Sequence, residues 1–158
     1  MVTDNDKKFL EQAIQIALDN IDNGGGPFGA VVVRNGEVIS ASGNRVVEDS
    51  DPTAHAEVLA IRKASGIIGT HSLEDCTIYT SCEPCPMCLG AIYWSGIKRV
   101  VYSASRYDVA RAGFSDEDIY NELSKEPSGR SVEFVSAETG KGLMVFEKWA
   151  GYPGKVSY

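Results

Sequence analysis

The spacing of hydrophobic positions predicts a helix and a hairpin at the start of the chain. Over residues 4–23 the apolar positions recur on one helical face, and Gly24-Gly25-Gly26 ends the pattern. Two short β-prone runs follow, at 28–33 and 37–42, separated by Asn35-Gly36. An Asn-Gly pair between such runs is typical of a two-residue hairpin turn. We therefore expect a helix followed by two antiparallel strands.

Helices and strands then alternate along the chain. A helix is predicted over 54–64, because Asp51-Pro52-Thr53 offers a capping residue and a proline before a run of helix formers. The further elements expected are strands at 76–80, 99–103 and 131–135, a helix at 87–94 and a last short element at 143–149. Five strands alternating with helices after a hairpin predict a three-layer α/β domain, with a mixed five-stranded sheet at its centre. Because no linker interrupts the pattern, a single domain is expected over residues 1–158.

Composition and charge narrow the class of protein. Of 158 residues, 43% are hydrophobic and 23% charged, which is typical of a globular domain with a sizeable core. A net charge of −7 disfavours general attraction to nucleic acid and fits a small neutral or cationic partner better. No apolar run approaches the roughly 20 residues that cross a bilayer, and the first residues do not resemble a signal peptide. We expect a cytoplasmic protein with no membrane partner.

Three of the four cysteines are clustered, which indicates metal binding in a reducing compartment. Cys85 and Cys88 are three residues apart, so on a helix they share one face and can bind the same ion. They fall near a predicted helix start, where the helix dipole favours thiolates. His55 falls near another predicted helix start. One imidazole and two thiolates favour zinc (Zn2+), with the fourth position open to water.

Glu57 follows His55 by two residues and is the candidate proton carrier. Zinc lowers the pKa of a bound water towards about 7, and a nearby carboxylate can move that water's proton to a substrate nitrogen. Residues i and i+2 point roughly 200° apart on a regular helix, so we expect the metal to sit off the helix end. The alternative is a closed structural site with Cys82 as fourth ligand, which would leave Glu57 without a function. Cys76 and His71 lie outside the pattern and are predicted to be a buried strand residue and a loop residue.

The motifs "HAE" at 55–57 and "PCPMC" at 84–88 match the H-x-E and P-C-x-x-C signature of zinc-dependent nucleobase and nucleoside deaminases. The chain therefore resembles this superfamily. The resemblance implies a cytidine-deaminase-like α/β/α fold, with His55, Cys85 and Cys88 as zinc ligands and Glu57 as the proton shuttle. It also implies attack by hydroxide on an amino-bearing ring carbon, with loss of ammonia.

Four further segments, "GGPFGAVVV", "DSDPTAHAEV", "TSCEPCPMCLGAIYW" and "AGFSDEDIY", resemble bacterial guanine deaminases of this fold. The resemblance spans about residues 9–121 and returns at Tyr158. It implies hydrolysis of guanine, a small-molecule purine base, to xanthine and ammonia in purine catabolism or salvage. It also implies a homodimer whose C-terminal tail, about residues 140–158, is exchanged between subunits.

The same resemblance implies five further site residues. Phe28 would pack against the purine and Asn44 would hydrogen-bond its edge, while Trp94 would form a wall of the pocket. Asp116 would hold the amino side of the base and assist proton transfer, and Tyr158 would close the site. Each has a structural alternative, since aromatic residues commonly fill cores, asparagines cap turns and aspartates cap helices.

Several other functions remain open on the sequence. Guanosine, cytosine and other amino-heterocycles require the same chemistry, and pocket dimensions decide between them. A tRNA adenosine deaminase would need a basic surface, which the acidic balance and the absence of an arginine-rich helix in 122–158 disfavour. A zinc-stabilised binding module without turnover is the non-enzymatic alternative, and Glu57 is the residue that distinguishes it from an enzyme.

Overall fold

The computed structural model describes residues 2–137 and 139–156 and contains a mixed four-stranded sheet. Contacts within the chain divide it into two compact units, Met1–Asp116 and Glu117–Tyr158. The elements of the first unit are α1 (Asp4–Asp22), β1 (Gly29–Arg34), β2 (Glu37–Gly43), α2 (Ala56–Ile68), β3 (Cys76–Cys82), α3 (Pro86–Trp94), β4 (Arg99–Ala104) and α4 (Arg106–Arg111). The second unit contains α5 (Glu117–Leu123), a 3-10 turn at Pro127–Gly129 and α6 (Gly142–Ala150).

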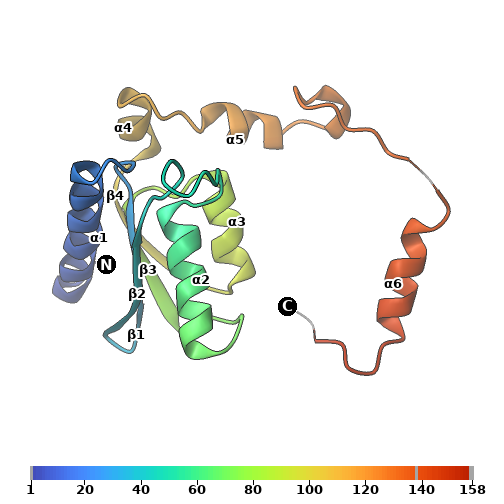
Figure 1. Cartoon of the computed structure of the whole chain (residues 1–158), viewed down its shortest axis with the longest axis horizontal. Helices are drawn as coiled ribbons and strands as arrows, with labels where there is room; N and C mark the ends of the chain where they lie inside the picture. The colour runs from blue at the N-terminus through green and yellow to red at the C-terminus, as the bar shows by residue number, and fades with distance from the viewer. Residues whose placement is uncertain (1, 138, 157–158) are drawn as a thin grey trace. The chain divides into compact units, whose positions relative to one another are not determined.

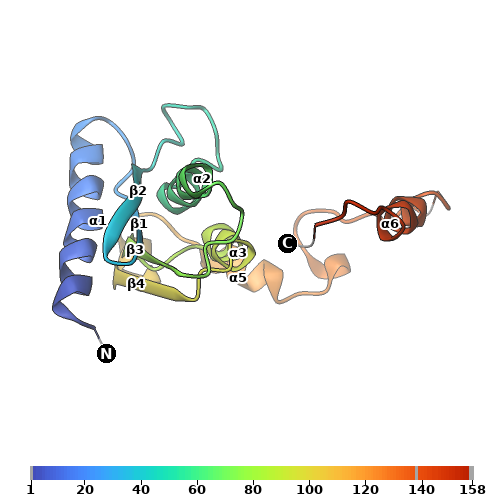
Figure 2. The same cartoon turned by 90° about the horizontal axis from the view of Figure 1, so that it is seen from below.

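The sheet is covered on both faces by helices of the first unit. Its strand order is β2-β1-β3-β4, in which β1 runs antiparallel to β2 and β3, and β3 runs parallel to β4. Helix α1 covers one face, and α2 and α3 cover the other (Figures 1 and 2). The predicted three-layer architecture with a mixed sheet is therefore confirmed.

Local sequence signals produced the hairpin and the first helix as expected. Asn35 and Gly36 between β1 and β2 have φ values of 52° and 80°, the left-handed backbone that a tight hairpin turn requires. Helix α1 starts with a capping box, in which the Thr3 side chain and the Asp6 side chain each bond to the other's backbone N–H. These signals act between residues that are close in the sequence, so the sequence alone can predict their effect.

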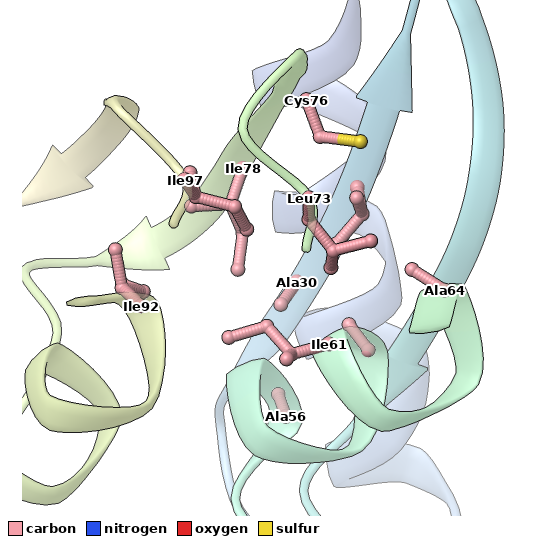
Figure 3. Close-up of a cluster of buried hydrophobic side chains, with 11 residues drawn as sticks. Ala30, Ala56, Ile61, Ala64, Leu73, Cys76, Ile78, Ile92 and Ile97 are labelled. Carbon is pink, nitrogen blue, oxygen red and sulfur yellow. The ribbon is translucent and has the colours of Figure 1, made fainter. Parts of the chain in front are cut away.

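Two apolar clusters pack against the two faces of the sheet. The cluster beneath α2 and α3 includes Ile61, Leu73, Ile78 and Ile92 (Figure 3). Cys76, at the start of β3, belongs to it, so its prediction as a buried strand residue is confirmed. His71 lies in the exposed connection between α2 and β3, as predicted. Strand β1 is buried almost throughout because it faces helices on both sides.

The predicted fifth strand at 131–135 is wrong. Among the described residues, this segment has no strand partner, and a strand is stable only when a neighbour accepts and donates its backbone hydrogen bonds. The Ser131 N–H donates instead to the Glu122 carboxylate, at 2.6 Å. The last short element predicted at 143–149 is present as α6.

The start of α2 also differs from the prediction. The N-cap is His55 and not a residue of the Asp51-Pro52-Thr53 segment. The Asp51 carboxylate accepts a hydrogen bond from the Thr53 N–H at 2.8 Å, which stabilises a turn just before the helix. No described helix combines the length and apolar character needed to cross a membrane.

A buried carboxylate fixes α1 to the sheet. Asp6 is 4% exposed and accepts two hydrogen bonds from Arg99 of β4, at 2.7 and 2.9 Å. The hydroxyl of Tyr79 on β3 donates a third, at 2.7 Å. The Arg99 guanidinium, followed by the Thr3 and Tyr79 donors, holds the pKa of the Asp6 carboxyl well below its usual range. This network ties three elements of the first unit together.

We expect Asp6→Asn to lower the urea concentration at the unfolding midpoint at pH 7, because Arg99 loses its charged partner. A carboxyl with a depressed folded-state pKa stabilises the fold above its unfolded pKa of about 4, and this contribution disappears as the pH falls. The difference in urea midpoint between wild type and variant should therefore become smaller as the pH is lowered from 5 to 3. A gap of constant size over that range would contradict the assignment.

Candidate active site

His55 and Glu57 lie at the N-terminus of α2, where the backbone changes from extended to helical. His55 is the N-cap, with φ −69° and ψ 150°, and Glu57 is in the first turn. Because His55 is not in helical conformation, the 200° separation of a regular helix does not apply to this pair. Both residues line the same cavity. The sequence placed both residues in the helix, whereas only Glu57 belongs to it.

Cys85 and Cys88 occupy the corresponding place on α3. Cys85 is the N-cap, with φ −66° and ψ 169°, Pro86 follows it, and Cys88 lies in the first turn. Neither His55 nor Cys85 makes a side-chain capping hydrogen bond. Caps are normally Ser, Thr, Asp or Asn, whose side chains satisfy backbone N–H groups. At these two positions the side chains contact each other instead.

The three predicted ligands come together in a geometry that suits zinc. His55 Nδ1 lies 3.5 Å from the Cys85 sulfur and 3.5 Å from the Cys88 sulfur. All three ligand atoms are within 4.8 Å of one another. A tetrahedral zinc with bonds of about 2.0 Å to nitrogen and about 2.3 Å to sulfur would separate the nitrogen from each sulfur by about 3.5 Å. The donor set and its spacing therefore fit the ion.

Cys82 does not join this group. Within the described parts of the chain, the cluster of potential ligands contains only the three residues above. Burial raises the pKa of the Cys82 thiol to about 12. The closed structural site that the sequence left open would need Cys82 as a thiolate ligand. The geometry instead leaves three protein ligands, the arrangement of catalytic zinc sites.

The pKa values of the two ligand thiols are shifted in opposite directions. The pKa of Cys85 is lowered because its thiolate accepts a hydrogen bond from Cys88, with His55 as a further partner. The same hydrogen bond, together with burial, raises the pKa of Cys88. The hydrogen bond to Cys85 raises the pKa of His55. A bound metal ion would take the place of these shared protons.

Two carboxyl groups face the cavity beside the ligands. Glu57 is 5% exposed, and burial raises its pKa. Asp116 is half-buried, and its pKa is also raised, first by burial and then by the negative charge of Cys85. Carboxyl groups whose pKa is raised within a cavity are common among groups that transfer protons.

The cavity has a volume of about 380 Å³, within the range of small-molecule sites. It brings together three of the predicted base-binding and acidic residues, Phe28, Asn44 and Asp116. The other lining residues are Gly24, Gly25, Gly26, Val46, Val47, His55, Glu57, Cys82, Glu83, Cys85, Val109 and Phe114. The sequence analysis assigned the three glycines to the end of a helix, and it included two of them, Gly25 and Gly26, in the motif "GGPFGAVVV".

Phe114 is a cavity residue that the sequence analysis missed. Its ring meets Phe28 edge to face, with centroids 5.0 Å apart and planes at 84°. The motif "AGFSDEDIY" contains it two residues before Asp116, so an aromatic next to a predicted site residue was the available signal. The two rings form an apolar wall from distant parts of the sequence.

Asn44 serves a turn and the cavity together. It is 7% exposed, and its Oδ1 accepts a hydrogen bond from the Val46 N–H at 3.2 Å. This bond orients the amide, and Nδ2 makes no hydrogen bond with any residue that the structure describes. Asn44 therefore stabilises a turn, which was its alternative predicted role. Its Nδ2 group remains as a hydrogen-bond donor beside the cavity.

Glu83, just before the P-C-x-x-C motif, positions a neighbouring helix. Its carboxylate accepts a hydrogen bond from the Arg106 N–H at the start of α4, at 3.1 Å. Its own N–H donates to the Ala104 carbonyl at 2.8 Å. These bonds connect the loop that presents Cys85 to the segment that leads to Phe114.

Trp94 is not among the described residues that line this cavity. It is the last residue of α3 and is 69% exposed. Cys85 faces the cavity from the opposite end of this nine-residue helix, which is roughly 13 Å long at 1.5 Å per residue. Tyr158, predicted to close the site, lies outside the described residues.

The chain is similar in sequence and in structure to zinc-binding deaminases. The family model described as the cytidine and deoxycytidylate deaminase zinc-binding region matches residues 3–104. Guanine deaminase of Bacillus subtilis is 46% identical over 98% of this chain and 99% of its own. Its crystal structure superimposes with a TM-score of 0.94 at 46% identity and covers 96% of this chain and 98% of that one.

Two further relatives match a smaller part of the chain. A probable cytosine deaminase of Schizosaccharomyces pombe is 42% identical over 70% of this chain and 67% of its own. A tRNA-specific adenosine deaminase of Aquifex aeolicus is 45% identical over 61% of this chain and 64% of its own. The similarity therefore extends beyond one substrate class.

Metal analysis of purified protein checks the ligand set. We expect about one zinc ion per wild-type chain and almost none in Cys88→Ala, because two ligands cannot hold the ion at a catalytic site. Cys82→Ala is the matched control, since it removes a buried thiol from the same cavity but no ligand, and it should keep its zinc. Loss of zinc from Cys82→Ala, with its circular dichroism unchanged, would contradict the three-ligand site.

Proposed function

The chain belongs to the cytidine and deoxycytidylate deaminase zinc-binding family, and on that basis we propose that it hydrolyses guanine to xanthine and ammonia. The observation that supports this most directly is one cavity in which a zinc-binding triad, two carboxyl groups, an amide and an aromatic wall meet. The near full-length similarity to a guanine deaminase supports the choice of base.

We assign the metal to His55, Cys85 and Cys88. When bound, zinc supplies a water nucleophile at neutral pH by lowering its pKa towards about 7. The chain's contribution is to hold three ligands in place from the starts of two helices, whose positive ends face the thiolates. Three protein ligands leave one position accessible from the cavity, where the base would bind.

Glu57 is the proposed proton carrier. It lies in the first turn of α2 beside the ligands and is buried away from bulk solvent, so a proton that it takes stays within the site. It would receive a proton from the attacking water, protonate the ring nitrogen next to the attacked carbon, and assist the departure of ammonia. Guanine and water together then give xanthine and ammonia.

The remaining cavity residues suit a flat base with polar edges. Phe28 and Phe114 provide an apolar surface for the ring, and the Asn44 amide provides a donor at its edge. The Asp116 carboxyl can accept a hydrogen bond from the exocyclic amine of guanine and assist its protonation. Their placement on three different segments fixes the orientation of the base relative to Glu57.

The rival substrates have less support. The guanine deaminase is 46% identical over 98% of this chain, whereas a tRNA-specific adenosine deaminase of Buchnera aphidicola is 37% identical over 94% of it, and the cytosine deaminase relative matches 70% of it. A net charge of −7 also disfavours an RNA substrate. We place the enzyme in the cytoplasm, where the cysteine thiols of the site stay reduced.

Ammonia release from guanine, guanosine, adenine, cytosine and a tRNA anticodon arm tests the substrate. We expect the zinc-loaded wild type to turn over guanine in preference to the others. Glu57→Gln should keep its zinc and lose about 10²- to 10⁴-fold in kcat, because it cannot carry the proton. Absence of reaction with guanine would refute the proposed substrate, and an active Glu57→Gln would refute the proposed proton carrier.

We also propose a homodimer in which the C-terminal tail, about residues 140–158, closes the partner's site, with Tyr158 at the closure. Helix α6 exposes large apolar side chains, among them Phe146 at 70%, which suits a surface that another chain covers. Domain exchange gives such a segment a partner at low cost. Trp94, exposed at the end of α3, would belong to a subunit surface instead of the cavity.

Complementation tests the exchange of tails. A chain lacking residues 154–158 should keep its zinc and lose at least about tenfold in turnover, because its sites stay open to water. Mixing it with full-length Glu57→Gln during refolding should restore about a quarter of wild-type activity, since half of the dimers would hold one complete site. If the mixture stays inactive while both proteins are dimeric and zinc-loaded, the tail does not close the partner's site.

A further inference from the structure

Asn20 connects two walls of the cavity without lining it. It is half-buried near the end of α1, and its Nδ2 donates hydrogen bonds to the Gly26 carbonyl at 2.7 Å and the Asn44 carbonyl at 2.8 Å. Gly26 belongs to the loop between α1 and β1, and Asn44 follows β2. Both of these acceptors line the cavity, whereas Asn20 does not.

Two glycines make room for the Asn20 side chain. A Cβ at Gly25 would lie 2.3 Å from Asn20 Nδ2, and a Cβ at Gly43 would lie 2.6 Å from Asn20 Oδ1. Both distances are far shorter than van der Waals contact, so neither position accepts a larger residue while Asn20 stays in place. The amide is therefore enclosed between the two segments that it joins.

The hydrogen bonds around Asn20 form a closed ring. The Gly26 carbonyl also accepts from the Phe28 N–H at 2.8 Å, and the Phe28 carbonyl accepts from the Asn44 N–H at 3.1 Å. The Asn44 carbonyl accepts the hydrogen bond from Asn20 Nδ2 that closes the ring. Asn20 contributes the side chain that closes it, and Phe28 and Asn44 are its other functional members. Their relative placement thus depends on one amide outside the cavity.

We propose that Asn20 is a positioning residue that sets the placement of the Phe28 ring and the Asn44 amide against the base. The inference rests on the proposed function, which gives these two groups the purine. An amide is suited to this role because one NH2 group can donate to two carbonyls at once. An aspartate of the same shape would instead direct a carboxylate oxygen at two carbonyl oxygens.

The kinetic test separates positioning from stability. Asn20→Ala and Asn20→Asp should raise KM for guanine about tenfold and change kcat by less than about threefold. Asn20 acts on groups that hold the base in both ground and transition states, and it touches neither Glu57 nor the zinc ligands. Zinc content should stay at the wild-type value in both variants.

Ser40→Ala is the matched control. The Ser40 hydroxyl donates to the Ala60 carbonyl at 2.7 Å and is buried in the same unit, but it does not line the cavity. This variant also loses a buried side-chain-to-backbone hydrogen bond, so it should lower the thermal midpoint without changing KM. If Asn20→Ala lowers the midpoint with an unchanged KM, its role is structural and the proposal is overturned.

Gly43→Ala displaces Asn20 without altering its chemistry. It should raise KM as Asn20→Ala does. In the Asn20→Ala background it should add little, because the amide atoms that lie 2.6 and 2.7 Å from the added Cβ are then gone and only the Cβ of residue 20 remains close, at 3.2 Å. Independent, multiplicative effects of the two substitutions on KM would overturn the proposed coupling.

Hydrogen exchange of the substrate-free protein distinguishes failure of this inference from failure of the proposed function. In Asn20→Ala, exchange should accelerate at the N–H groups of Phe28, Asn44 and Val46 but not along β3. Unchanged exchange at these three positions overturns the positioning role whatever the substrate. Faster exchange in a protein that does not deaminate guanine supports the positioning role while refuting the proposed base.

Discussion

The site depends on two helices that begin at the same place. His55 caps α2 and Cys85 caps α3, and because both helices pack on one face of the sheet, their first turns converge. His55 Nδ1 consequently lies 3.5 Å from both ligand sulfurs. The positive ends of the helices favour thiolates there, and the thiolates in turn favour a cation. Two positions that would normally hold capping residues are thus used for metal ligands.

The sequence predicted the parts of the structure that local signals determine. The Asn35-Gly36 turn and the His/Cys/Cys grouping follow from a few neighbouring residues, and the structure has both. The prediction of a strand at 131–135 was wrong because β-prone residues form a strand only when a partner strand is present. Phe114 was missed, and Trp94 is not among the residues that line this cavity, because cavity walls depend on how distant segments pack, which residue spacing does not specify.

Chemistry and selectivity come from different parts of the fold. The motifs to which we assign metal binding and proton transfer lie within residues 3–104, the segment that the family model matches. The aromatic and amide wall is assembled from the loop before β1, the turn after β2 and the segment after α4. Changes in those connections can alter the accepted base while the zinc chemistry is retained, as expected when a scaffold supports loops of variable sequence.

X-ray absorption at the zinc edge of the wild-type protein tests the open, three-ligand zinc site most directly. We expect two sulfur neighbours at about 2.3 Å and two nitrogen or oxygen neighbours at about 2.0 Å, from one imidazole and one exchangeable ligand. Three sulfur neighbours would show that Cys82 completes a closed structural site, and the proposed catalysis would then have no metal position available.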